Sequence, residues 1–132
     1  YSNPKTAFTA SFFGQPSIFK DYTKFRNFES IENIDNAVVR PEFVKVTKKT
    51  EVQKYSKSAE EGIVEEVNFR GFGIELRIRV NGVVLTARRS FDEPKVEVGE
   101  KVDVFLYQLF VTEGNEARLL KNQSLREPVV VI

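Results

Sequence analysis

Side chains that could bind an anion gather in the middle of the sequence. Four arginines lie on or near the polar face of two neighbouring strand-like runs: Arg77, Arg79, Arg88 and Arg89. Because a guanidinium and hydroxyl groups can hold a sulfate-like oxyanion, we take as candidate ligands Thr86, Arg88 and Ser90. Acidic residues nearby would neutralise part of this patch: Glu75, Asp92 and Glu93. The sequence therefore favours a small oxyanion here over a nucleic acid polymer.

Most enzyme chemistries lack their usual residues in this chain. There is no cysteine and no histidine, which excludes a disulfide, a thiolate nucleophile, a zinc-thiolate site and the commonest general base. No glycine is followed by lysine, so the loop that cradles nucleotide phosphates is absent, and Gly71-Phe72-Gly73 is better explained as a tight turn. Asp92 and Glu93 are typical of a charged turn rather than a metal site. We expect no catalytic, cofactor or metal residues here.

The arginines are positioned by a predicted β-hairpin. In Gly73–Val80 apolar residues alternate strictly with charged ones, which is the period of a strand with one buried face. Asn81-Gly82 tolerates positive φ at both positions and predicts a two-residue type I′ turn into a second strand, Val83–Arg89. The turn sets the register, with Val80 opposite Val83, Ile78 opposite Leu85, Leu76 opposite Ala87 and Glu75 opposite Arg88.

A third strand is predicted over Lys101–Val111, after a bend at Pro94–Gly99. Its apolar residues occupy both faces, with Phe105, Tyr107 and Leu109 on the second one. A curved sheet or barrel whose outside is partly covered, by another segment or by another subunit, explains this pattern.

The flanking regions predict one short helix and several short strands. Asn3-Pro4 and Gly14 bracket a helix over Lys5–Phe13, with Phe8 and Phe12 on one face. Further strands are expected at Ser17–Tyr22, Phe25–Ile31, Ala37–Val39, Phe43–Val46 and Ala117–Leu120. Arg40-Pro41 marks a strand end, an edge or a turn. We expect a mobile loop over Thr47–Glu61, a turn at Glu113–Glu116, and pairing of the apolar Pro128–Ile132 with the sheet.

Length and composition describe one ordinary domain. The 132 residues are 41% hydrophobic and 30% charged, and the net charge of +1 gives no reason to invoke a polyanionic partner. The predicted fold class is all-β, a small barrel with one short N-terminal helix.

Several landmarks, in order, resemble the C-terminal part of ATP-binding subunits of ABC importers. They are Tyr1–Gly14, Val39-Arg40-Pro41-Glu42, Gly62–Val67 with Gly71 and Gly82, and Gly99–Val102. The resemblance implies a regulatory domain of the sulfate/molybdate or polyamine/iron type, with a small oligomer-binding-fold barrel called a TOBE unit at about 62–120. Residues 1–14 would be a helix trailing from an absent nucleotide-binding domain, and residues 15–132 the regulatory domain. Because the chain starts at Tyr1, we expect it to be a piece of a longer protein.

The same resemblance implies a noncatalytic role. The parent protein would use ATP and magnesium to drive solute uptake, with an oxyanion as the favoured solute, from the cytoplasmic face of the membrane. Its partners would be its own nucleotide-binding domain, membrane permease subunits and a second copy. The candidate surface for that copy comprises Phe8, Phe12, Phe105, Tyr107 and Leu109. The alternative is a free-standing oligomer-binding-fold module for single-stranded nucleic acid.

Overall fold

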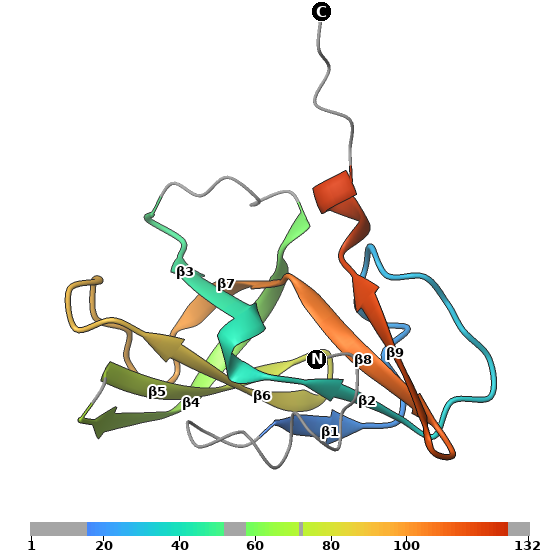
Figure 1. Cartoon of the computed structure of the whole chain (residues 1–132). Helices are drawn as coiled ribbons and strands as arrows, with labels where there is room; N and C mark the ends of the chain where they lie inside the picture. Colours follow the sequence, from blue (N-terminus) through green and yellow to red (C-terminus); the bar gives the residue numbers. More distant parts are fainter. Residues whose placement is uncertain (1–15, 52–57, 72, 127–132) are drawn as a thin grey trace, which may run out of the picture.

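The computed structural model describes residues 16–51, 58–71 and 73–126, and in this part the chain is nearly all β (Figure 1). The elements are β1 Ser17–Phe19, β2 Asn36–Val39, the 3₁₀ turn η1 Pro41–Phe43, β3 Val44–Lys48, β4 Glu60–Arg70, β5 Gly73–Val80, β6 Val83–Arg89, β7 Lys101–Leu106, β8 Gln108–Glu113, β9 Glu116–Lys121 and the 3₁₀ turn η3 Gln123–Arg126. The all-β prediction is confirmed. The predicted helix over Lys5–Phe13 and the pairing of Pro128–Ile132 lie outside the described residues.

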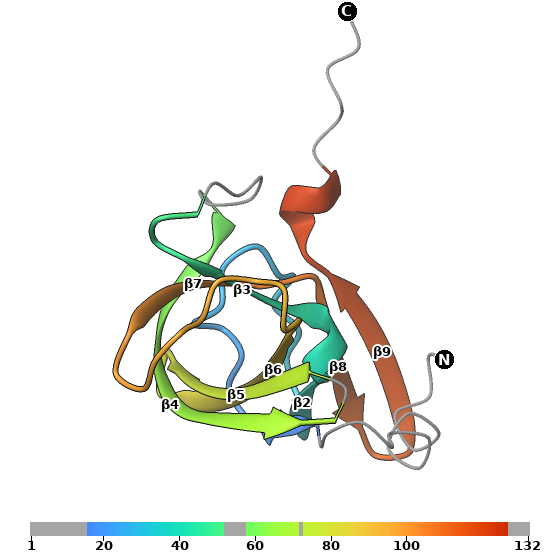
Figure 2. The ribbon, with the colours of Figure 1, turned by 90° about the vertical axis from the view of Figure 1, so that its left-hand side faces the viewer.

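Two antiparallel sheets share the core. One has the strand order β1-β2-β8-β9 and the other β3-β7-β4-β5-β6. In the second sheet the outer strands β3 and β6 lie against each other, so the sheet curls into a small barrel, which Figure 2 shows nearly end-on. No helix among the described residues is long and apolar enough to cross a membrane.

The central hairpin has the predicted ends and register. β5 and β6 pair Val80 with Val83, Ile78 with Leu85, Leu76 with Ala87 and Glu75 with Arg88. Asn81 and Gly82 have φ values of 50° and 84°, as a type I′ turn requires. The alternation therefore places three apolar pairs in the barrel interior, where Leu76, Ile78 and Leu85 are fully buried.

Replacing Gly82 with valine is expected to lower the free energy of unfolding by about 1–2 kcal/mol, because a β-branched side chain resists positive φ. Urea denaturation followed by circular dichroism measures the change. The matched control is Gly82→Asn, which tolerates the same backbone conformation and should cost much less. Equal stability of the valine variant would mean that the turn type is wrong.

The single strand predicted over Lys101–Val111 is wrong, because the chain changes sheets at Tyr107. Its backbone N–H donates to the carbonyl of Phe43, and its carbonyl accepts from the N–H of Asn122, at 2.9 Å each. These bonds take Tyr107 out of the β7 and β8 ladders. Phe105 and Leu109, on either side of it, are nearly completely buried within this one chain. The double-faced apolar pattern thus reflects a strand switch between two sheets.

The aromatic region before residue 32 is mostly a loop rather than two strands. β1 ends at Phe19, and no strand covers Phe25–Ile31. The reason is Tyr22, which is 2% exposed: its hydroxyl donates to the carbonyl of Glu29 at 2.6 Å and accepts from the N–H of Ile31 at 2.7 Å. Folding around this hydroxyl satisfies backbone groups that a strand would otherwise pair.

Other predicted boundaries shift by small amounts. The strand predicted over Ala37–Val39 is β2, and Pro41 begins η1, so β3 starts one residue later than predicted. The loop predicted over Thr47–Glu61 is shorter, because β3 runs to Lys48 and β4 begins at Glu60. The turn at Glu113–Glu116 is confirmed, and the strand predicted over Ala117–Leu120 is β9, which pairs with β8.

Candidate functional site

The three candidate oxyanion ligands lie on β6 and in the turn that follows it. Thr86 and Arg88 lie on the outer face of β6, where Arg88 is paired with Glu75 across the hairpin. Ser90 follows in a turn, and its N–H already donates to Glu93 Oε1 at 2.8 Å. Burial raises the pKa of the Glu93 carboxyl, but hydrogen bonds from Ser90 and Lys45, with the charge of Arg89, outweigh it, so the pKa is lowered. This ionised carboxylate beside Ser90 opposes an anion.

Arg89 does not belong to the polar face, where the sequence placed it. It points inward and is 3% exposed. Its guanidinium donates to the carbonyls of Val46 and Pro94, both at 2.6 Å, and to Glu51 Oε1 at 3.1 Å. Because Val46 lies on β3, this side chain joins β6 to β3 and closes the barrel, so its role is structural.

The candidate surface for a second copy is only partly exposed. Phe105 is buried, and the ring of Tyr107 packs nearly perpendicular to its ring at a centroid distance of 5.0 Å. Leu109 is buried in the core, whereas Phe8 and Phe12 lie outside the described residues. The apolar character of Phe105 and Leu109 therefore needs no neighbouring molecule, and pairing of two copies stays a prediction.

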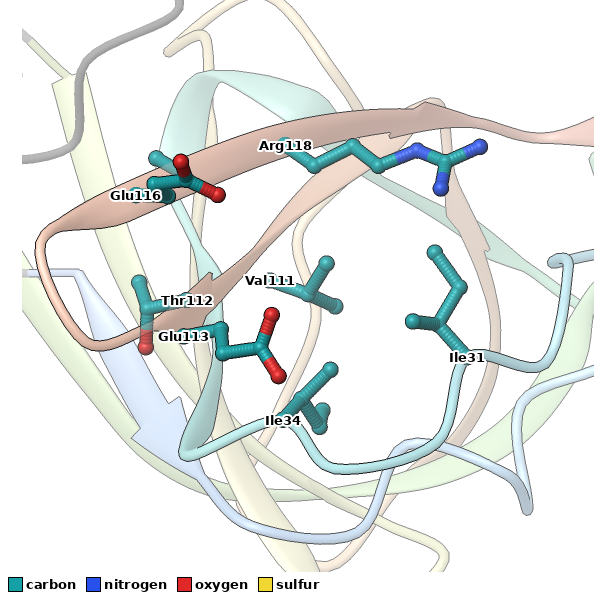
Figure 3. A pocket seen from close by; sticks show the side chains of 8 residues that line it. Ile31, Ile34, Val111, Thr112, Glu113, Glu116 and Arg118 are labelled. Carbon is teal, nitrogen blue, oxygen red and sulfur yellow. The ribbon is translucent and has the colours of Figure 1, made fainter.

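A pocket of about 180 Å³ lies between the β1–β2 connection and the β8–β9 hairpin. It is lined by Ile31, Ile34, Val111, Thr112, Glu113, Glu116, Ala117 and Arg118. Figure 3 shows the side chains of Ile31, Ile34 and Val111 facing the same space, with the Glu113 carboxylate beside them and Arg118 above. We call this the hairpin pocket.

The alternation of β8 and β9 supplies one wall of the hairpin pocket. Val111 and Glu113 are two residues apart on β8 and are paired with Arg118 and Glu116 on β9, so all four side chains emerge on one face. The opposite wall is held at the hairpin tip by Asp35. Its N–H donates to the carbonyl of Thr112 at 2.6 Å, and its carboxylate accepts from the N–H of Gly114 at 2.8 Å.

The charges around the hairpin pocket are mainly negative. Glu113 and Glu116 are directly opposite each other, and neither makes an ion pair with any described residue. Like charges facing each other across a hairpin destabilise it, and a bound cation would relieve that repulsion. Arg118, whose guanidinium is beside the hairpin pocket, already pairs with Glu29 at 3.3 Å. The arrangement can therefore bind an organic cation whose apolar part contacts Ile31 and Ile34.

Sequence reasoning missed this pocket. The local sequence indicates only a turn at Glu113-Gly114-Asn115-Glu116 and only a strand at Ile31. The available signal was two glutamates at the two ends of one predicted hairpin turn, which places them opposite each other. Nothing in the sequence shows that Ile31 and Ile34 reach this hairpin.

One known protein has a sequence similar to this chain. No family model matches the sequence. The chain is similar to an import ATP-binding protein. Over 124 residues it is 30% identical to the spermidine/putrescine import ATP-binding protein PotA of Borrelia garinii subsp. bavariensis, an alignment that covers 80% of this chain and 32% of PotA. The chain thus spans about a third of the length of PotA. The similarity supports the expected kind of family, ATP-binding subunits of ABC importers, and leaves the TOBE unit and the sulfate/molybdate type as predictions.

Proposed function

We propose that the chain is the noncatalytic regulatory portion of the ATP-binding subunit of an organic amine importer, and that the hairpin pocket senses a linear diamine. The observation that carries the proposal is the pair of glutamates opposite each other in the β8–β9 register, Glu113 and Glu116, in a pocket that Ile31 and Ile34 also line. The name of PotA, which specifies spermidine and putrescine import, supports the choice of an amine.

A linear diamine matches this chemistry in two ways. An ammonium group donates charge-assisted hydrogen bonds to carboxylates, and it relieves the repulsion between two of them. The methylene chain can cover the side chains of Ile31, Ile34 and Val111, which contributes roughly 0.8 kcal/mol for each buried methylene. An oxyanion at Thr86, Arg88 and Ser90 remains a prediction, but the lowered pKa of Glu93 beside Ser90 makes that place less favourable.

If the chain is part of such a subunit, ATP binding and contact with the membrane belong to the whole parent protein. It would bind ATP and magnesium in its nucleotide-binding domain, pair with a second copy and contact permease subunits at the cytoplasmic face of the membrane. The single-stranded nucleic acid module is not favoured, because cross-strand carboxylates pair with arginines on the outer face of β4 and β5. These ion pairs are Arg70–Glu75, Arg77–Glu66 and Arg79–Glu65.

Isothermal titration with putrescine tests the amine site. We expect saturable binding to the wild-type chain and at least tenfold weaker binding when Glu113→Gln and Glu116→Gln are combined, because both ammonium acceptors lose their charge. The matched control combines Glu65→Gln and Glu66→Gln, two exposed glutamates on β4 away from the hairpin pocket, and should bind putrescine normally. A titration with sodium sulfate should give the same heat for the wild-type chain and for the variant that combines Glu113→Gln and Glu116→Gln. Equal putrescine affinity in both double variants would refute the assignment.

A further inference from the structure

The connection between β1 and β2, residues 20–35, touches both sheets of the molecule; we call it the bridging loop. Near its C-terminal end, Ile31 and Ile34 line the hairpin pocket. In its middle, Arg26 reaches the barrel: its N–H donates to Glu60 Oε2 at 2.9 Å, and its guanidinium donates to the carbonyl of Ala59 at 2.6 Å. One loop therefore contacts the candidate ligand site and the first residues of β4.

Within the bridging loop, hydrogen bonds connect the region of Arg26, which contacts the barrel, with Ile31, which lines the hairpin pocket. The backbone of Phe25, next to Arg26, donates to the carbonyl of Tyr22 at 2.9 Å. The hydroxyl of Tyr22 in turn bonds Glu29 and Ile31 at 2.6 and 2.7 Å. Tyr22 and Phe25 are 2% and 3% exposed, so the segment from Arg26 to Ile31 is folded around a buried hydroxyl.

On the barrel side, the carboxylate of Glu60 is held by more than one hydrogen bond. Glu60 accepts from Arg26 and, at 3.3 Å, from the side-chain amide of Asn81, which lies at the β5–β6 turn. The same amide donates to the carbonyl of Lys24 at 3.1 Å. The carboxylate of Glu60 thus links the bridging loop to the start of β4 and to the central hairpin.

We propose that occupancy of the hairpin pocket is coupled to the contact between Arg26 and the start of β4, so that the bridging loop transmits amine binding to the barrel. This inference rests on the proposed amine site. A ligand that touches Ile31 and Ile34 on the loop and the glutamates on the hairpin binds best when the loop is docked. Since the Arg26 contacts favour the docked loop, thermodynamic linkage requires that ligand and contact stabilise each other equally.

The first test is the putrescine affinity of variants that do not touch the hairpin pocket. We expect Arg26→Ala to weaken putrescine binding about three- to tenfold, at the low end of typical coupling. Glu60→Ala should have a similar effect. The double variant should weaken binding by less than the product of the two single effects, because both changes remove the ion pair between Arg26 and Glu60. The matched control is Arg79→Ala, another half-exposed arginine in an ion pair with a glutamate of β4, but one that does not touch the loop; it should bind putrescine as the wild type does.

Amide hydrogen exchange gives a second readout that a merely structural role of Arg26 would not produce. Putrescine should slow exchange at Arg26 and at residues 111–118 in the wild-type chain. In the Arg79→Ala control the same putrescine-dependent protection should appear at both places. Slower exchange at residues 111–118 alone in the wild-type chain would contradict the coupling.

The outcomes separate the coupling from the amine site. If the wild-type chain binds putrescine and both Arg26→Ala and Glu60→Ala bind it with unchanged affinity, the coupling is wrong and the amine site stands. If the wild-type chain does not bind putrescine, the proposed function fails and the coupling fails with it. Weakened binding in both variants, with an unchanged Arg79→Ala control, supports the coupling.

Discussion

Replacing Arg89 with methionine is expected to destabilise the fold by about 3–5 kcal/mol, the typical cost of removing one partner from a buried ion pair. The variant removes the guanidinium that donates to the carbonyls of Val46 and Pro94 and to the carboxylate of Glu51. Methionine has a similar length, so the lost volume is small and the change comes mainly from unsatisfied polar groups.

The measurement is urea denaturation of the Arg89→Met variant, followed by far-ultraviolet circular dichroism. The matched control is Arg79→Met on the neighbouring strand, where the arginine side chain is 52% exposed and pairs with Glu65. Exposed pairs contribute at most about 1 kcal/mol, so this control should lie near the wild type. If Arg89→Met were as stable as Arg79→Met, the guanidinium would not close the barrel.

Replacing Gly62 with valine is expected to cost about 1–3 kcal/mol through overpacking. A Cβ at this buried position of β4 would lie 2.6 Å from Cγ2 of Ile78, 2.9 Å from Cγ2 of Val80 and 3.0 Å from Cγ2 of Val104. All three neighbours are β-branched and have few alternative χ1 rotamers, so they cannot move aside cheaply. The expected loss is therefore at the upper end of that range.

Thermal unfolding of Gly62→Val measures this effect, with Gly71→Val as its matched control. A Cβ at Gly71 meets nothing within 4 Å, so that variant carries the same change in residue type without the crowding. An unfolding midpoint for Gly62→Val that matches the midpoint for Gly71→Val would show that the barrel interior has room at β4.

Local patterns predicted the central hairpin well, because its information lies within one segment. Strict alternation and Asn81-Gly82 determine the ends, the turn and the register of β5 and β6 together. The inward position of Arg89 was not predicted, although its parity matches that of Leu85 and Ala87. A charged residue at a strand end is normally assigned to solvent, and its partners come from β3 and from the loop after β6.

The parts that sequence reasoning missed depend on contacts between distant segments. The change of sheets at Tyr107 requires hydrogen bonds to Phe43 and Asn122. The bridging loop is folded around the Tyr22 hydroxyl, although its aromatic composition favours strands. The hairpin pocket needs Ile31 and Ile34 to meet β8 and β9, and no local pattern carries that information.

The most direct test of the amine site is a titration of the ¹⁵N-labelled chain with putrescine, followed by two-dimensional NMR. We expect saturable shifts of the amides of Ile31, Ile34 and residues 111–118, with the largest changes near Glu113 and Glu116. We expect the amides of residues 86–90 to shift little. No saturable shift, or shifts that are centred on residues 86–90 and leave the hairpin pocket unchanged, would contradict the amine site.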